Sequence, residues 1–365
     1  MPEARVQRMD ASDSGLGRRT VLKGALGALA LPALGSSVLA AAPKRRDSPA
    51  LVVLYLNGGP PGLFNSAGSF LPKGAFGVTT QNVRSLGNDL LVDSASMGTL
   101  PAAALGNMAA INFKHGIYRH DLARAALLQT GSRSNLLMLA QAMGTAPAPI
   151  RCAVVNSLGL PVGVDASSPA EGGTTLEKVV DLRSIAFTVD PANPSPSAKQ
   201  IAAAYHVDPT STTISDLKTT LLAAELLLRT GSSVVFTQPA FIGRPDRQFD
   251  THEDLTGVRA RQIMGSIIPE VRTFIGRALE IPGRNVVIAL FGEFSRTVDT
   301  SDHEPGGTAT VIGKFVKTGT AGPQNPDGSA PINSPPTAGL WAYLAAALKV
   351  EEHPFGVNPN PELVV

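Results

Sequence analysis

The segment Asn285–Gly307 reads NVVIALFGEFSRTVDTSDHEPGG and has two unlike halves. After Asn285, residues 286–290 are apolar with no polar alternation, which is typical of a strand buried on both faces of a sheet. The second half gathers charged and imidazole side chains: Glu293, Arg296, Asp299, Asp302, His303 and Glu304. In an open α/β sheet, ligands bind just beyond the carboxyl ends of the strands. The segment therefore predicts an α/β fold with a polar site at that edge.

The rest of the chain repeats this alternation of short apolar runs and longer stretches of helical period. Strands are predicted at Leu51–Leu56, Arg151–Val155, Ser233–Phe236, Asn285–Leu290 and Thr308–Val316. Helices are predicted at Asp121–Gln129, Ser215–Arg229, Glu253–Leu279 and Leu340–Lys349. Pro269 should kink the third helix or start a new one. This order predicts a central, mostly parallel sheet with helices on both faces.

The N-terminal segment has the pattern of an export signal. GRRTVLKG, residues 17–24, places paired arginines before the weakly apolar run Gly24–Ala42. We expect residues 1–42 to be a twin-arginine signal peptide, cleaved near Ala40 or Ala41, and residues 43–365 to be a single domain. The twin-arginine translocase would be the partner during export, and the product would be periplasmic or secreted. The alternative is that this segment is an uncleaved membrane anchor, although Gly, Ser and Pro suit a lipid-facing helix poorly. If the signal is cleaved, no stable membrane span is expected.

Composition narrows the classes of partner. The predicted signal carries five of the 31 Lys and Arg residues and three of the 29 Asp and Glu residues, which leaves 26 of each in the mature chain. No basic field remains, so a nucleic acid is not an expected partner. Cys152 is the sole cysteine, which excludes an internal disulfide. Nothing in the sequence indicates an oligomeric state.

Two more polar clusters resemble the one after the predicted strand Asn285–Leu290. FDTHED, residues 249–254, and HGIYRHD, residues 115–121, each precede a predicted helix. Carboxylate and imidazole groups suit zinc, manganese and similar divalent ions, so the clusters could close around one or two metals. Such a metal would polarise a phosphoryl or sulfuryl oxygen.

Each cluster also has a structural interpretation. Asp250 or Thr251 could cap the following helix. Glu293 and Arg296 could form an ion pair, and Asp302 with His303 could belong to an ordinary solvated loop.

Taken together, these motifs resemble a known family. A twin-arginine signal, a strand ending in Gly-Gly, an Asp-x-His, the motif GEFSRT and a later Asp-His are similar to the exported family called domain of unknown function 1501. That family is similar to the alkaline phosphatase and sulfatase superfamily. The resemblance covers nearly all of the mature chain and implies an alkaline-phosphatase-like, three-layer sandwich.

The resemblance also implies roles for individual residues. Divalent metal, Zn, Mn, Ca or Mg, would be bound by Asp250, His252, Glu293, Asp302 and His303. His120 would be a further ligand or an acid/base group, and Arg296 would bind an anion or support the ligands. The implied activity is metal-dependent hydrolysis of a phosphate or sulfate monoester.

The chain departs from the family pattern in the loop after the first strand. Where the family has Gly-Gly-x-Asp-Gly, this chain has Gly-Gly-Pro-Pro-Gly at residues 58–62, and no carboxylate occurs from Asn57 to Asn82. Ser66 and Ser69 lie in that neighbourhood but have no adjacent base to activate them. Ser295 and Glu304 replace glycines. A second hypothesis is therefore a catalytically degenerate periplasmic protein that binds a sugar, an anion or a protein partner.

Overall fold

In the computed structural model, the described residues are 47–60, 81–144, 148–155, 173–185, 196–239, 248–297, 300–322, 325 and 330–365. The predicted signal peptide, residues 1–42, lies outside these ranges. So do several residues singled out from the sequence: Pro61, Ser66, Ser69 and Asp299.

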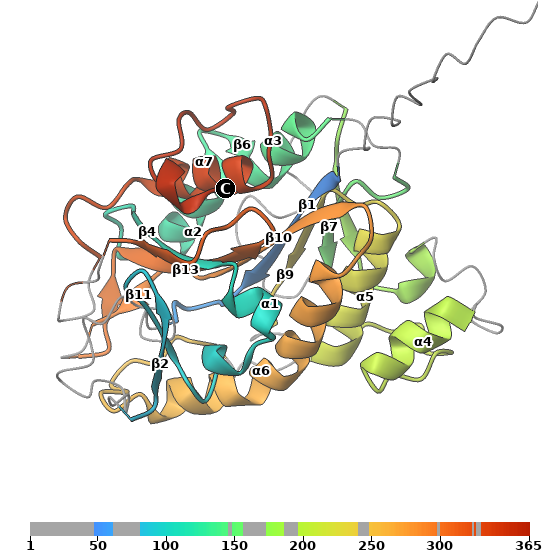
Figure 1. Cartoon of the computed structure of the whole chain (residues 1–365), viewed down its shortest axis with the longest axis horizontal. Helices are drawn as coiled ribbons and strands as arrows, with labels where there is room; N and C mark the ends of the chain where they lie inside the picture. The colour runs from blue at the N-terminus through green and yellow to red at the C-terminus, as the bar shows by residue number, and fades with distance from the viewer. Residues whose placement is uncertain are drawn as a thin grey trace, which may run out of the picture. The chain divides into compact units, whose positions relative to one another are not determined.

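In the described part of the chain, eight strands form one sheet in the order β14-β4-β13-β10-β1-β9-β7-β8 (Figure 1). They are β1 Ser48–Tyr55, β4 Met108–Lys114, β7 Cys152–Val155, β8 Leu176–Val179, β9 Val234–Thr237, β10 Arg284–Phe291, β13 Gly306–Gly313 and β14 Gly319–Ala321. β13 is antiparallel to both β10 and β4, and the other neighbouring pairs are parallel. The prediction of a mostly parallel sheet is confirmed.

Helices cover both faces of this sheet. One apolar cluster contains residues of α1 Ala102–Leu105, α4 Pro196–Ala204, α5 Leu217–Arg229 and α6 Val258–Leu279. The other contains residues of α2 His120–Leu128, α3 Asn135–Ala142 and α7 Thr337–Ala347. Figure 1 shows these two sets of helices on opposite sides of the strands. The predicted α/β sandwich, with helices on both faces of the sheet, is therefore confirmed.

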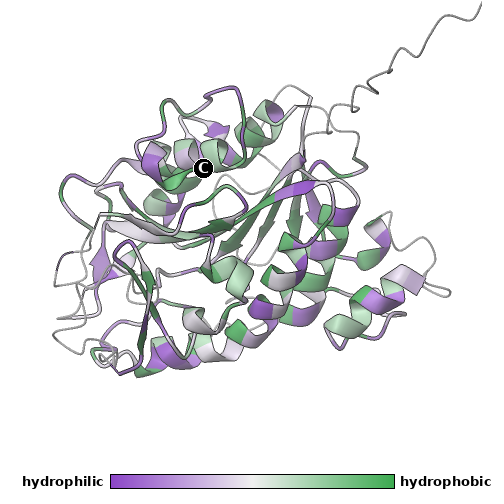
Figure 2. Cartoon of the chain, viewed as in Figure 1, coloured by the Kyte–Doolittle hydropathy of each residue, from purple (hydrophilic) through white to green (hydrophobic). Residues whose placement is uncertain are grey.

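The central strands show why the sequence lacks polar alternation. In β1, Ala50, Val52 and Leu54 join the cluster of α5 and α6, whereas Leu51, Val53 and Tyr55 join the cluster of α2, α3 and α7. Both faces of the strand are covered, so every position is apolar. Figure 2 shows the central strands as mainly hydrophobic, while α6 combines hydrophobic and hydrophilic residues. The lack of polar alternation in the sequence of β1 thus indicates that both of its faces are buried.

Some element boundaries differ from the prediction. The helix predicted from Glu253 begins at Val258, after Gly257 in the left-handed region, and Pro269 lies inside one continuous helix. Burial of Ile267, Ile268 and Val271 on either side of the proline holds that helix together. The strand predicted to start at Thr308 starts at Gly306.

Smaller elements complete the described chain. Three two-stranded ribbons pair β2 Val83–Gly87 with β3 Leu90–Asp93, β5 Gln129–Thr130 with β6 Arg133–Ser134, and β11 Ser295–Arg296 with β12 His303–Glu304. Short 3-10 helices are η4 Met97–Thr99, η5 Leu182–Ser184 and η7 Pro361–Leu363. Residues Arg45–Val365 cluster as one compact unit. No helix among the described residues has the length and apolarity needed to span a bilayer.

Candidate metal centre

The polar clusters meet at one edge of the sheet because of its topology. β1, β4, β9 and β10 end at this edge, and β13 begins there because it runs in the opposite direction. Glu293 follows β10 by two residues, and His120 opens α2 after β4. Asp250 lies on the connection from β9 to α6, and His303 lies in β12, just before β13. Four segments that are distant in sequence therefore converge, as expected for an α/β sheet.

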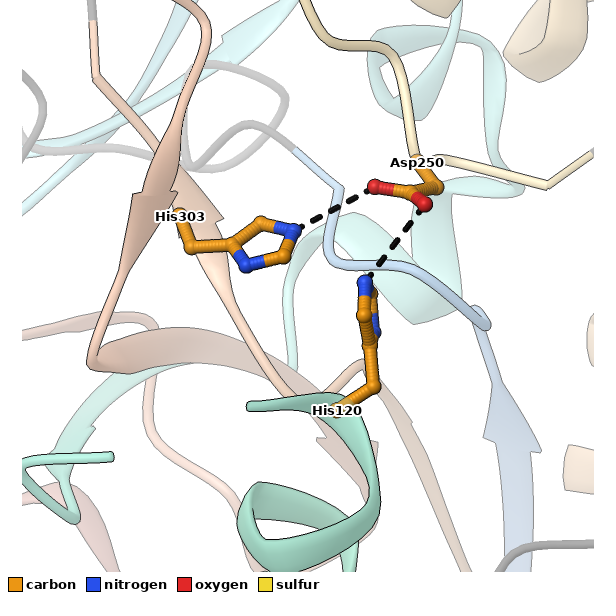
Figure 3. Close-up of side chains that lie close together, drawn as sticks. All are labelled: His120, Asp250 and His303. Carbon is orange, nitrogen blue, oxygen red and sulfur yellow. Dashed lines mark hydrogen bonds and ion pairs between the residues drawn. The ribbon is translucent and has the colours of Figure 1, made fainter. Parts of the chain in front are cut away.

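Asp250 is the centre of the cluster. Its Oδ1 lies 2.7 Å from Nη2 of Arg296, 3.0 Å from Nε2 of His252 and 3.3 Å from Nε2 of His303. Its Oδ2 lies 3.5 Å from Nε2 of His120. Figure 3 shows the rings of His120 and His303 directed at this carboxylate from two sides. Hydrogen bonds from His120, His303 and Arg296 hold the pKa of Asp250 far below its ordinary value, so the group is ionised.

The imidazole of His120 is oriented by Glu293. Nδ1 of His120 lies 2.8 Å from Oε1 of Glu293. Burial alone would raise the pKa of Glu293, but hydrogen bonds and the charge of Arg124 lower it to about 2. An ionised carboxylate only accepts hydrogen bonds, so Nδ1 of His120 donates and Nε2 faces Asp250. Burial lowers the pKa of His120, and the contacts with Asp250 and Glu293 outweigh burial and raise it to about 9.

The imidazole of His303 is fixed in the same way. Its Nδ1 lies 3.0 Å from the backbone carbonyl oxygen of Tyr118. A carbonyl oxygen cannot donate, so Nδ1 carries the proton and Nε2 faces Asp250. The ring also stacks on Phe294, with centroids 4.2 Å apart and 11° between the planes. His303 thus has a defined tautomer and a defined ring plane.

Glu293 is fully buried and has all its acceptor positions filled. Oε2 accepts from the Tyr55 hydroxyl at 2.6 Å and from the Gly58 amide at 3.1 Å. Oε1 accepts from His120 and from Nε of Arg124, which lies 2.9 Å away. The sequence predicts Glu293 as a metal ligand. The structure places it behind His120, where it supports the imidazole, and outside the candidate ligand groups of the described chain.

Arg296 is also fully buried, and its donors are directed at the protein. It donates to the backbone carbonyls of Gly58, Gly59 and Ser301 and to Asp250. The guanidinium therefore anchors Asp250 to the turn after β1. The alternative of a Glu293–Arg296 ion pair is wrong, because Glu293 pairs with Arg124 and Arg296 pairs with Asp250.

The turn after β1 requires glycine where it touches the site. Gly58 has φ +94°, and a Cβ on it would lie 2.4 Å from the backbone nitrogen of Asp250. Its amide donates to Glu293 and its carbonyl accepts from Arg296. This single residue therefore links the Glu293–Arg124 and Asp250–Arg296 ion pairs of the site.

His252 and Asp302 form the outer part of the cluster. Nδ1 of His252 lies 3.5 Å from Oδ1 of Asp302, and both side chains are largely exposed. Neither Asp250 nor Thr251 makes the helix cap that the alternative interpretation proposes. Asp254 accepts the hydrogen bonds of two amides at the start of α6 instead.

Two groups of described side chains have the ligand types and spacing that a metal needs. One is His120, Asp250 and His303, and the other is His252, Asp302 and His303. Ligand atoms about 2.0–2.1 Å from a tetrahedral zinc lie roughly 3.3 Å from one another. Nε2 of His303 lies 3.3 Å from Oδ1 of Asp250 and Nε2 of His120 lies 3.5 Å from Oδ2, which are separations of this size. The residues present therefore fit a divalent ion.

Sequence analysis missed three contributors to the site. Tyr55 lies at the end of β1, Arg124 lies one helical turn after His120, and Tyr118 acts only through its backbone. Arg124 had a usable signal, because residues four apart share one face of a helix. A backbone carbonyl carries no such signal.

The matches of this chain are to solved structures of low sequence identity. No protein family model matches, and no curated protein matches. Among solved structures, the alkaline phosphatase from the Antarctic bacterium TAB5 has 8% identity and a TM-score of 0.42, covering 84% of this chain and 100% of that one. A 2-O GAG sulfatase has 12% identity and a TM-score of 0.40, covering 87% and 74%. The phosphonate monoester hydrolase of Agrobacterium radiobacter has 13% identity and a TM-score of 0.37, covering 86% and 77%.

Proposed function

We propose that this chain is a divalent-metal-dependent hydrolase of phosphate or sulfate esters. We further propose that it belongs to the domain of unknown function 1501 family, within the alkaline phosphatase and sulfatase superfamily, and reaches the periplasm through the twin-arginine pathway. The resemblance of the sequence motifs supports the ester class, and the paired arginines before an apolar run support the export route. The metal dependence follows from the geometry around Asp250.

The observation that carries the proposal is the pair of imidazole nitrogens facing Asp250. Because His120 and His303 each donate through Nδ1, their Nε2 atoms point at an ionised carboxylate. If both imidazoles were neutral, the lone pairs of their Nε2 atoms would face the negative charge of Asp250. Their Nε2–carboxylate distances of 3.5 and 3.3 Å exceed the roughly 2.7–2.9 Å of a charge-assisted hydrogen bond. The spacing suits a shared divalent ion better than two protons.

A bound divalent ion would supply Lewis-acid polarisation of the ester oxygen. The chain's own residues prepare the site for it. Glu293 accepts the Nδ1 proton of His120, so that Nε2 is the nitrogen directed toward the ion, and Arg296 keeps Asp250 in place. His252 lies beside Asp302 and is more exposed than His120 and His303, so it is the imidazole of the cluster with the most contact with solvent.

A second candidate is a metal-free anion-binding protein. The observation in its favour is that protons on His120 and His303 would also satisfy Asp250, with Arg296 as a third positive partner. The resulting cationic cleft would bind a small anion without hydrolysing it. The two candidates differ in metal content, which decides between them.

The test is elemental analysis of the purified protein, combined with assays of p-nitrophenyl phosphate and p-nitrophenyl sulfate after reloading with Zn, Mn, Ca or Mg. We expect a stoichiometric metal content and metal-dependent release of p-nitrophenol. His303→Ala should abolish both. His353→Ala, which alters an exposed histidine remote in sequence, is the matched control and should change neither. A substoichiometric metal content that His303→Ala leaves unchanged would exclude the hydrolase.

Export is tested separately. Replacing Arg18 and Arg19 by lysine should keep the protein out of the periplasmic fraction of a bacterium with a twin-arginine translocase. Unaltered periplasmic accumulation would contradict the proposed route.

A further inference from the structure

We infer that the chain binds one divalent ion rather than two, and that the ion occupies the group of His120, Asp250 and His303. This inference rests on the proposed metal dependence and adds the stoichiometry and the position of the ion. Three features of the described residues support it.

The first feature is a shared ligand atom. Both candidate groups contain His303. Its Nδ1 is committed to the carbonyl oxygen of Tyr118, which leaves Nε2 as the one available lone pair. A single lone pair binds a single ion. The two groups are therefore alternatives, and occupation of one removes His303 from the other.

The second feature is the guanidinium of Arg296. A carboxylate that bridges two ions needs one oxygen for each of them. Oδ1 of Asp250 already accepts from Arg296 at 2.7 Å. The fully buried guanidinium is held by three backbone carbonyls as well, so it cannot swing away. Arg296 thus supplies a fixed positive charge beside Oδ1 and opposes a second cation there.

The third feature is the difference in order between the groups. His120 and His303 have side-chain exposures of 27% and 13%, and each has its tautomer fixed by a hydrogen bond through Nδ1. His252 and Asp302 have exposures of 48% and 65%. Fixing exposed side chains costs conformational entropy, so the inner group, which is His120, Asp250 and His303, binds the ion more tightly.

The experiment is to load metal-free protein with Zn²⁺ or Co²⁺, remove excess ion by gel filtration and measure the ions bound per chain. We expect one ion in the wild type, one in His252→Ala and in Asp302→Asn, and a large loss in His120→Ala. The visible absorption of bound Co²⁺ should change in His120→Ala and persist in His252→Ala. Two ions per chain, or an ion lost in His252→Ala and retained in His120→Ala, would overturn the inference.

A direct location of the ion covers the case in which His120→Ala does not fold. Anomalous scattering from Zn²⁺-loaded wild-type crystals should give one peak between His120 and His303, and a peak between His252 and Asp302 would contradict the inference. The outcomes also separate the two proposals. One ion without ester hydrolysis sustains the inference and removes the proposed function. Two bound ions together with ester hydrolysis would overturn the inference and sustain the proposed function. The absence of any bound ion would overturn both proposals.

Discussion

Replacing Glu293 by Gln perturbs the support of the proposed metal ligand His120 without changing the size of the side chain. Glu293 is fully buried and accepts four hydrogen bonds, two at each oxygen. An amide offers one acceptor oxygen, so its NH2 group must face two donors. The least costly orientation points NH2 at Tyr55, whose hydroxyl can turn to accept. The Gly58 amide then stays unpaired, and Arg124 loses its counter-charge.

Two routes give the size of the effect on stability. The pKa of Glu293 is about 2 instead of 4.5, which favours the ionised form in the folded state by about 3 kcal/mol at roughly 1.4 kcal/mol per pH unit. Independently, removing one partner of a buried ion pair costs about 3–5 kcal/mol. We therefore expect the variant to lose about 3 kcal/mol in the free energy of unfolding. The hydrogen bond from Nδ1 of His120 then goes to a neutral oxygen instead of a charged one, which should also weaken metal binding by about 10- to 100-fold.

A second buried glutamate provides the matched control. Glu225 in α5 is fully buried and is held by the Tyr205 hydroxyl at 2.8 Å and by Arg229 and Arg277. Burial favours its neutral form, but these partners lower its pKa. Glu225→Gln should therefore lose a similar amount of stability, because the chemistry is the same. It should leave metal affinity unchanged, because these partners do not contact the candidate ligands.

The assays are urea denaturation monitored by far-UV circular dichroism and titration of metal-free protein with Zn²⁺. If Glu293→Gln loses less than about 1 kcal/mol, the account of its four hydrogen bonds is wrong. If Glu225→Gln weakens Zn²⁺ binding as much as Glu293→Gln does, the effect is general destabilisation, and the positioning role fails.

Three further predictions follow from the same geometry. The pKa of Glu293 is depressed, so its contribution to the free energy of unfolding is present above pH 4.5 and is lost as the pH falls toward about 2. The free energy of unfolding should therefore fall less steeply with decreasing pH in Glu293→Gln than in the wild type. Equal slopes in the two proteins would refute this. His120 has a pKa of about 9 without metal, so the ion must displace its proton in order to bind. Zn²⁺ affinity should therefore rise about tenfold per pH unit from pH 7 to 9 and then level off. Calorimetry in buffers of different ionisation enthalpy should detect the released proton. Gly58→Ala should lower the free energy of unfolding by about 3 kcal/mol or more and impair metal binding. The control is Gly116→Ala: Gly116 has φ +74° but open space at its Cβ, so this variant should lose about 1 kcal/mol and bind metal normally. Equal losses of stability would show that backbone strain, not the clash with Asp250, dominates.

The sequence predicts most of the sheet because its central strands are buried on both faces. β1 from Ala50 and β10 from Val286 are apolar runs, and their burial explains that pattern. β4 escapes prediction because MAAINFK contains two alanines and a polar residue in place of Val and Ile. Asn112 is nevertheless buried, and its Oδ1 accepts from the Thr308 hydroxyl on the neighbouring β13. A cross-strand hydrogen bond of this kind depends on residues nearly two hundred positions apart.

The candidate site was predictable to the level of the cluster, and its division into roles was not. The rule that ligands gather at the carboxyl ends of strands brings Asp250, His252, Asp302 and His303 to one edge, where the structure places them. The rule says nothing about which acceptors are already in use. Glu293 reads as a ligand in sequence, yet its oxygens are filled by donors from three other segments.

The charges of the site bear on the kind of ester it would accept. The carboxylates of Glu293 and Asp250 each have an arginine partner, Arg124 and Arg296, so each pair is internally neutral. Asp302 adds one exposed negative charge, and a divalent ion in the inner group would leave the cluster with a net charge of +1. A neutral ester gains little from that field. A phosphate or sulfate monoester is negatively charged and would be attracted to the ion. In the proposed hydrolase, the arginine pairs would therefore prevent the carboxylates of Glu293 and Asp250 from repelling an anionic substrate.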